Sequence, residues 1–199
     1  MKYCLKISLV FLFLFTIKTA FAQESEIFVH NDKLYKTVDR WFSIGVGGSL
    51  NTELKEREVN FDAAFHQRIW KIYLQTGYHR CSDEFLYDAS LLKSLSLQKM
   101  NDLYFGVGWR SSKLYSNVSF FTGPAYSYGS RFHHTDPISN ADFFEAYNAL
   151  GLYSNFNFTY KLFYDIGIGV SLYDSYNKYY HVYGFRFHIY FSGAFRKNV

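Results

Sequence analysis

The sequence predicts an all-β chain that forms a transmembrane antiparallel up-and-down β-barrel of eight strands, with ten strands as the alternative. Three observations predict this fold: polar and apolar residues alternate in eight segments, short and long links alternate between the segments, and aromatic residues gather near both segment ends. Alternation with a period of two is typical of a strand with one apolar face. The other two observations place that face against lipid rather than against a second sheet.

The N-terminal region has the three parts of a secretory signal peptide. Lys2 and Lys6 precede a short apolar run, and Ala20 and Ala22 supply the small residues of a cleavage site. The run is too short for a membrane-spanning helix, which needs about 20 residues. We therefore expect a cleaved signal peptide at 1–22, a polar periplasmic leader at 23–40 and the outer-membrane barrel at 41–199.

The composition excludes several functional classes. Aromatic residues make up 22% of the chain, and an exported chain without a spanning helix must cover them in a β-sandwich or in lipid. The formal charge of +4 includes three lysines of the signal peptide, so the mature chain carries +4 − 3 = +1 and gives no argument for a nucleic-acid partner. Cys4 leaves with the signal peptide, so no intramolecular disulfide is expected at Cys81.

Eight segments follow the alternating pattern. In the clearest of them, Ile166, Ile168 and Val170 oppose Gly167 and Gly169. Because successive side chains of a strand point to opposite faces, each segment has one apolar face and one small or polar face. The predicted strands are 41–50, 59–67, 72–81, 102–110, 114–128, 149–159, 162–172 and 183–192.

Short and long links alternate between these segments. The second, fourth and sixth links lie around 70–71, 111–113 and 160–161, whereas the others span 51–58, 82–101, 129–148 and 174–180. Transmembrane barrels have short periplasmic turns and longer external loops. The pattern therefore predicts four external loops, with both chain termini on the periplasmic side.

Amphipathic aromatic rings prefer the level of the lipid headgroups. Several aromatic residues fall near the ends of the predicted strands, close to the short or to the long links. We expect these residues at the two membrane interfaces: Trp41, Trp70, Trp109, Tyr115, Tyr160, Tyr126, Tyr147 and Tyr173.

This architecture resembles the small eight-stranded outer-membrane β-barrels of Gram-negative bacteria, the OmpA/OmpX-like group. The resemblance covers the chain from about Trp41 onward and rests on the pattern of strands and links, not on a fixed motif. It implies a monomer in the bacterial outer membrane, with outer-membrane lipid around it and a surface or envelope protein as a candidate partner. Members usually end on an aromatic residue, whereas here Phe195 is followed by four further residues.

Charged and polar residues fall on the face opposite the apolar one. An outward Arg at the middle of a bilayer costs about 2–4 kcal/mol, and side chains fill the interior of an eight-stranded barrel. We expect an interior polar network, in which Asp165 bridges Arg186 and His188, while a narrow pore or a ligand pocket remains the alternative. The predicted interior residues are Asp62, His66, Arg68, Gln75, His79, Arg110, Asn155, Asn157, Asp165, Arg186 and His188.

The leading functional interpretation is a structural or surface-contact role, such as membrane integrity, adhesion or partner contact through external loops, with no catalysis and no cofactor. The alternatives are a lipid A deacylase or acyltransferase, a narrow channel and a soluble periplasmic binding module. Acyl hydrolysis needs a nucleophile, a base and an orienting acid within reach of one another. The segment 133–136 offers only a loose set of such groups, and the same segment is a weak candidate for a metal site. Cys81 is interpreted as a small buried residue that fills space in the interior.

Overall fold

The computed structural model describes residues 27–30, 33–36, 40–52, 56–82, 99–113, 115–137, 142–163 and 165–192. The predicted signal peptide at 1–22 and most of the predicted loop at 82–101 lie outside these residues. In the predicted leader, β1 (Ile27–His30) and β2 (Lys33–Lys36) pair with each other as a separate antiparallel sheet.

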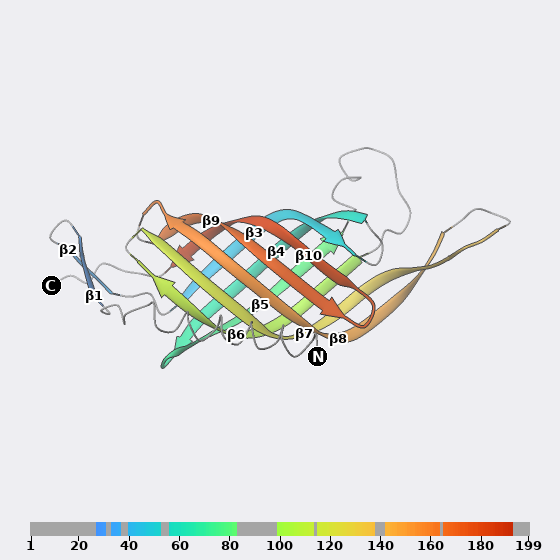
Figure 1. Ribbon diagram of the computed structural model, residues 1–199, viewed down its shortest axis with the longest axis horizontal. Helices are drawn as coiled ribbons and strands as arrows, with labels where there is room; N and C mark the ends of the chain where they lie inside the picture. The colour runs from blue at the N-terminus through green and yellow to red at the C-terminus, as the bar shows by residue number, and fades with distance from the viewer. Residues whose placement is uncertain are drawn as a thin grey trace, which may run out of the picture.

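Eight antiparallel strands close into one barrel in the order β10-β3-β4-β5-β6-β7-β8-β9 (Figure 1). Each strand pairs with its sequence neighbour, and β10 closes the barrel against β3. The predicted eight-stranded up-and-down barrel is thus confirmed, and the ten-stranded alternative is wrong because β5 pairs directly with β6. The barrel strands are β3 (Arg40–Asn51), β4 (Glu56–Ile69), β5 (Ile72–Ser82), β6 (Lys99–Ser112), β7 (Ser116–Thr135), β8 (Asp142–Lys161), β9 (Ile166–Asn177) and β10 (His181–Ser192).

The predicted strand 162–172 begins too early. Leu162, Phe163 and Asp165 lie between β8 and β9, where the Phe163 amide donates a hydrogen bond to the Ile166 carbonyl oxygen at 3.0 Å. Leu162 and Phe163 are exposed apolar residues of this link. Their apolar character continues the alternation of β9, so periodicity alone places the boundary too early.

The predicted alternation of link lengths holds only in part. The first link, 52–55, and the seventh, 178–180, are no longer than the turn at 162–165. The predicted loop at 129–148 is largely strand, because β7 continues to Thr135 and β8 begins at Asp142. We call the end of the barrel with the links 70–71, 113–115 and 162–165 the turn end, and the opposite end the loop end.

β7 and β8 form a hairpin that projects from the loop end of the barrel, at the right of Figure 1. The last pairing of β7 with β6 is at Ser130, and the last pairing of β8 with β9 is at Gly151. Beyond those residues the two strands pair only with each other, with a register shift between Phe132 and His134. A strand rises about 3.3 Å per residue, so 131–135 extends the hairpin about 15 Å past its last β6 partner.

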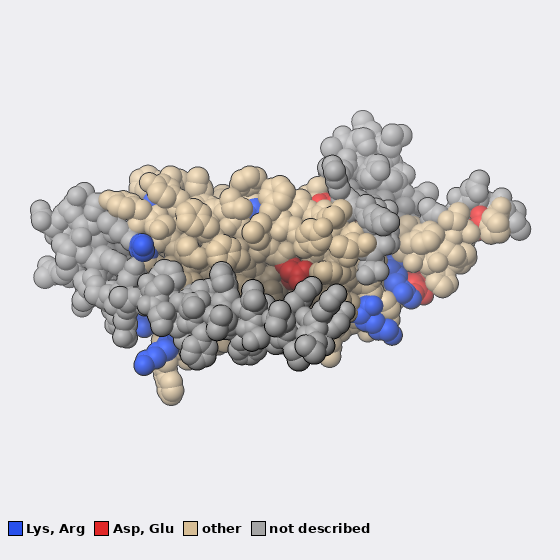
Figure 2. Space-filling view, viewed as in Figure 1, with Lys and Arg blue, Asp and Glu red and all other residues tan. Residues whose placement is uncertain are grey.

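The outer face of the barrel is apolar along its whole middle. The register brings Val46, Phe187, Val170 and Phe158 into one row of cross-strand partners on four adjacent strands, and all four are exposed. On the part of the wall visible in Figure 2, most side chains are neither acidic nor basic, and charged side chains lie mainly beside the β7–β8 hairpin and at the opposite end of the barrel. Among the described residues, no helix has the length and hydropathy needed to cross a membrane.

Candidate functional site

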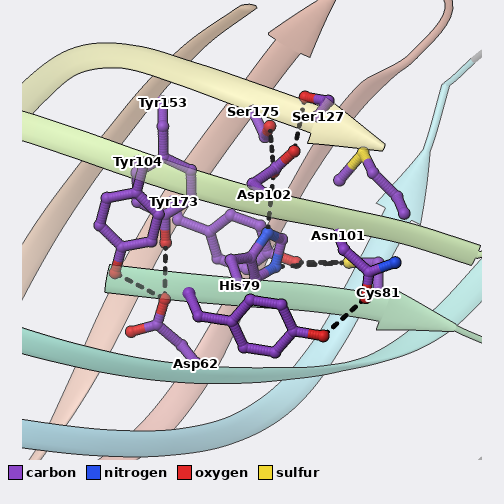
Figure 3. Close-up of polar contacts among 12 residues, drawn as sticks. Asp62, His79, Cys81, Asn101, Asp102, Tyr104, Ser127, Tyr153, Tyr173 and Ser175 are labelled. Carbon is purple, nitrogen blue, oxygen red and sulfur yellow. Dashed lines mark hydrogen bonds and ion pairs between the residues drawn. The ribbon is translucent and has the colours of Figure 1, made fainter. Parts of the chain in front are cut away.

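Buried polar and aromatic side chains fill the loop half of the barrel interior. They come from β4, β5, β6, β8, β9 and β10, and strand register brings His79 opposite both Asp62 and Asp102. We call these residues the loop-side cluster, of which Figure 3 labels all but Arg186: Asp62, His79, Cys81, Asp102, Tyr104, Tyr153, Tyr173 and Arg186.

Asp62 and Arg186 form the charged centre of the loop-side cluster. The Arg186 Nη1 atom lies 2.8 Å from Asp62 Oδ1, an ion-pair contact without the alignment of a hydrogen bond. The hydroxyls of Tyr104 and Tyr153 donate to the same carboxylate oxygen at 2.8 and 3.2 Å. Arg186 also donates to the Tyr153 hydroxyl and lies over the Tyr173 ring, with Cζ 4.2 Å from the centroid. The two charges therefore compensate each other inside a cage of tyrosines.

The Asp102 carboxylate is held by three side chains. Ser127 donates to Oδ1 at 2.6 Å, Ser175 donates to Oδ2 at 2.7 Å, and His79 Nδ1 lies 3.2 Å from Oδ2. Both Asp102 and His79 are fully buried. These contacts fix the orientation of the carboxylate toward His79.

Cys81 lies on the other side of the His79 ring. Its Sγ is 3.4 Å from His79 Nε2, 3.3 Å from the Ser49 hydroxyl oxygen and 3.4 Å from the Tyr173 hydroxyl oxygen. Cys81, His79 and Asp102 thus form a row in which the imidazole contacts the thiol through one nitrogen and the carboxylate through the other. The sulfur is fully buried.

A second cluster fills the turn half of the interior. We call Trp41, His66, Tyr73, Arg110, Phe121 and Tyr190 the turn-side cluster. The Trp41 and His66 rings stack with their centroids 4.5 Å apart and their planes at 6°. Arg110 Cζ lies 3.9 Å from the centroid of the Trp41 ring. Arg110 also donates to the Tyr190 hydroxyl at 2.9 Å. Cation–π contact and ring stacking therefore place a guanidinium group within an aromatic interior.

The structure places most of the predicted interior residues inside the barrel. Asn157 is half-buried and donates to the Ser119 hydroxyl at 3.3 Å, while Arg68 is half-buried near the turn end and donates to the Trp70 carbonyl oxygen at 2.8 Å. His188 contacts the hydroxyls of Ser171 and Thr159 at 2.7 and 2.9 Å. The predicted residues that are buried are Asp62, His66, Gln75, His79, Arg110, Asn155, Arg186 and His188.

The predicted role of Asp165 is wrong. Asp165 is exposed in the turn between β8 and β9, and its backbone carbonyl oxygen accepts a hydrogen bond from Ser192. The acidic partner of Arg186 is Asp62 instead. The prediction counted Asp165 as inward because side chains alternate between inside and outside along a strand. Asp165 precedes the start of β9, and this alternation applies only within a strand.

Three of the predicted interface aromatics point inward. Trp41, Tyr147 and Tyr173 are 5%, 7% and 4% exposed, because each has the inward parity of its strand. Nearness to a strand end determines the level of a ring but not the face to which it points. The others lie on the outside: Trp70, Tyr115, Tyr126 and Tyr160 are exposed, and Trp109 is half-buried.

The sequence interpretation missed Asp102, Tyr104, Tyr153 and the inward role of Tyr173. The signal for Asp102 was present, since it has the same parity as Tyr104 and Arg110 in β6. Its partners come from distant parts of the chain, with Ser127 on β7 and Ser175 on β9, and sequence spacing does not reveal such contacts.

The segment around His133 forms part of the projecting hairpin. His133 Nδ1 lies 3.6 Å from Glu145 Oε2, and the rings of His133 and His134 meet edge to face at 4.9 Å. Within the described part of the chain, no group of three or more His, Cys, Asp or Glu side chains is arranged to hold a metal ion.

The closed barrel, with its apolar outside and polar, filled inside, has the fold of the small eight-stranded outer-membrane barrels. No family model matches the chain, and no curated protein matches it. Three solved structures share the fold at very low sequence identity. Neisserial surface protein A (NspA) has a TM-score of 0.57 at 9% identity, with 77% of this chain and 96% of that chain covered.

The other two give the same result. Ail, the attachment invasion locus protein of Yersinia pestis, has a TM-score of 0.52 at 11% identity, covering 78% of this chain and 97% of that one. The N-terminal β-barrel domain of Pseudomonas aeruginosa OprF has a TM-score of 0.50 at 8% identity, covering 76% and 96%. Likeness at this identity establishes the fold and leaves function to the site itself.

Proposed function

We propose that this chain is a bacterial outer-membrane protein that makes surface contacts through the projecting β7–β8 hairpin, while its filled barrel serves as the membrane anchor. The observation that carries the proposal is the extension of two strands past all their barrel partners. A barrel that only spans a bilayer needs about 9–11 residues per strand, whereas β7 and β8 have 20 each.

The apolar outer face supports the membrane part of the proposal. Exposed Phe, Ile, Leu, Val or Tyr residues lie on the outside of all eight strands, and soluble monomers rarely expose contiguous apolar patches above a few hundred Å². A closed barrel also has no edge strand in its wall, as a lipid environment requires.

Cross-strand contacts hold the hairpin in a defined shape that suits a contact surface. Arg131 pairs with Glu145, and the rings of His134 and Phe143 stack at 5.1 Å and 8°. At the base of the hairpin, Arg131 Cζ lies 4.4 Å from the Tyr179 ring, which connects the hairpin to the link between β9 and β10. Phe132 and Phe143 remain exposed, and exposed aromatic residues are enriched at protein interfaces.

Two proteins with this fold have names that refer to the cell surface: Neisserial surface protein A and the attachment invasion locus protein. These names are consistent with a surface role for an eight-stranded barrel. They do not identify a partner for this chain.

The test replaces residues 131–145 with Asn-Gly, a two-residue turn that can join Ser130 to its cross-strand partner Ala146. Cells that express the intact chain should settle or adhere more than cells with an empty vector, and the shortened variant should return to the empty-vector level. Protease added to intact cells should cleave the intact chain within the hairpin. Equal adhesion by the intact and shortened chains would contradict a contact role, and a chain recovered without detergent would contradict the membrane location.

The Lys71→Ala variant is the matched control, because Lys71 lies in a turn at the opposite end of the barrel. It should leave adhesion unchanged. Heat-dependent migration on semi-native gels confirms that each variant still forms a barrel.

A further inference from the structure

The row of Cys81, His79 and Asp102 has the connectivity of a nucleophile, a base and an orienting acid. His79 Nδ1 faces Asp102 at 3.2 Å and Nε2 faces the Cys81 sulfur at 3.4 Å. In nucleophilic sites the base contacts the nucleophile and is itself oriented by a third group, and this arrangement recurs on unrelated folds. The sequence interpretation of Cys81 as an inert filler did not include these contacts.

The surroundings of the row supply hydrogen-bond partners for the carboxylate and for the thiol. Ser127 and Ser175 donate to the Asp102 carboxylate, and His79 Nδ1 lies 3.2 Å from the same group, so His79 directs an N–H toward Asp102 through Nδ1. The Nε2 atom then either accepts the Cys81 proton or holds it as part of an imidazolium ion. The Tyr173 hydroxyl lies 3.4 Å from the sulfur and can donate to a thiolate.

The position of the sulfur restricts what can reach it. Cys81 belongs to a buried apolar cluster that includes Met100, Tyr147, Tyr180 and Val182, and its exposure is 0%. A bulky or charged reagent has no place in this packing. Hydrogen peroxide is among the smallest thiol oxidants and carries no charge, so it is the reagent that this packing hinders least.

We propose that Cys81 is an activated thiol that reacts with small hydroperoxides, with His79 as its acid–base partner and Asp102 as the residue that positions His79. The thiolate sulfur attacks one peroxide oxygen, so that an S–O bond forms as the O–O bond breaks. The leaving hydroxide takes the proton that His79 received from the thiol and departs as water. Cys81 is oxidised to a sulfenic acid and the peroxide is reduced.

The test measures the rate at which hydrogen peroxide oxidises Cys81 at pH 7, with the sulfenic acid trapped by dimedone and quantified by mass spectrometry. The Cys4→Ser variant leaves Cys81 as the one thiol in the chain. An ordinary thiol is only a few per cent ionised at this pH, and because nucleophilicity falls with the thiol pKa, a pKa lowered to near 7 raises the rate about threefold. The folded barrel in detergent should therefore react about threefold faster than the urea-unfolded chain.

His79→Gln should bring the folded rate down to the unfolded rate or below. Tyr173→Phe provides a second variant that keeps the ring over which Arg186 lies and removes the hydroxyl near the sulfur, and it should slow the reaction toward the unfolded rate. His181→Gln is the matched control and should react like the parent chain, because His181 forms a similar His–Asp pair with Asp174 at 2.8 Å on the exposed surface.

A folded rate equal to or slower than the unfolded rate would overturn the proposal and leave Cys81 as an inert buried residue. An unchanged rate in both folded His79→Gln and Tyr173→Phe would overturn the assigned roles. Neither outcome depends on the surface contacts of the hairpin, so this test and the adhesion test fail independently.

Discussion

Arg186 on β10 pairs with Asp62 on β4 although β3 lies between these two strands in the barrel. Both side chains are almost completely buried, and the pair therefore joins strands that share no backbone hydrogen bonds. The ion pair acts as a brace across the interior, with Tyr104 and Tyr153 hydrogen-bonded to the same carboxylate oxygen.

Asp62→Ala should strongly destabilise the barrel. Removal of one partner of a buried ion pair leaves an uncompensated charge, which costs about 3–5 kcal/mol. Urea unfolding in lipid vesicles, followed by tyrosine and tryptophan fluorescence, measures this loss. Asp62→Leu combined with Arg186→Met should recover much of the stability, because no isolated charge then remains in the interior.

Asp165→Ala is the control for this prediction. Asp165 lies exposed in a turn, and surface substitutions of this kind change stability by about 0.5 kcal/mol or less. A loss of stability for Asp165→Ala as large as that for Asp62→Ala would contradict the assignment of Asp62 as the acidic partner of Arg186.

Trp41→Ala should cost far more stability than Trp70→Ala. Trp41 is buried between His66 and Arg110, whereas Trp70 is 91% exposed in the turn between β4 and β5. Loss of a buried Trp typically costs about 3–5 kcal/mol, against about 1 kcal/mol or less for an exposed one. The same unfolding measurement compares the two variants, and similar losses would contradict the inward position of Trp41.

The comparison of Trp41 with Trp70 also indicates how far the sequence predicts this molecule. The alternation of polar and apolar residues predicted the number of strands and whether most side chains point into or out of the barrel, since a strand has a strict period of two. It did not determine the facing of Trp41, Tyr147 or Tyr173, because their predicted position was argued from strand ends instead of parity. The hairpin at 129–148 was missed because its polar and aromatic composition is also typical of a loop.

The interior site was predictable only one strand at a time. Parity placed Asp62, His79 and Arg186 inside the barrel, but their partners depend on barrel closure and strand tilt, which local pattern does not specify. The pairing of Arg186 with Asp62 joins residues far apart in sequence and two strands apart in the sheet. Contacts of this kind, including those of Cys81, appear only once the register of all eight strands is known.

Val170→Arg should destabilise the protein in a bilayer. Val170 is exposed at mid-strand on the apolar outer face, with Phe158 and Phe187 as its cross-strand partners. An Arg near the bilayer midplane costs about 2–4 kcal/mol. Reversible unfolding in vesicles tests this, with Val170→Ala as the size control, and a loss no larger than that of the Ala variant would place this face outside the hydrocarbon.

The intact barrel should give no long-lived currents in planar bilayers. The Tyr104 and Tyr153 rings stack at 4.0 Å across the loop half of the interior, and the turn-side cluster fills the other half. The number of strands sets the same expectation, since side chains fill an eight-stranded barrel. Stable single-channel currents from the purified intact chain would contradict a filled lumen, and the Asp62→Leu, Arg186→Met variant controls for loss of the central charges.

Expression of the chain should leave lipid A unchanged. Acyl chains of the surrounding lipid lie against the outer face, where the strands present Ile, Leu, Val and Phe side chains. The row of Cys81, His79 and Asp102 is fully buried on the inner side of the wall, and the β5 and β6 backbones separate it from lipid. A reacting ester must come within hydrogen-bond reach of its nucleophile and base, and no acyl chain can do so without opening the barrel. Mass spectra of lipid A from expressing cells should therefore match those from empty-vector cells and from cells with His79→Gln. A lost or added acyl chain that disappears in His79→Gln would show that this interior row reaches the lipid phase.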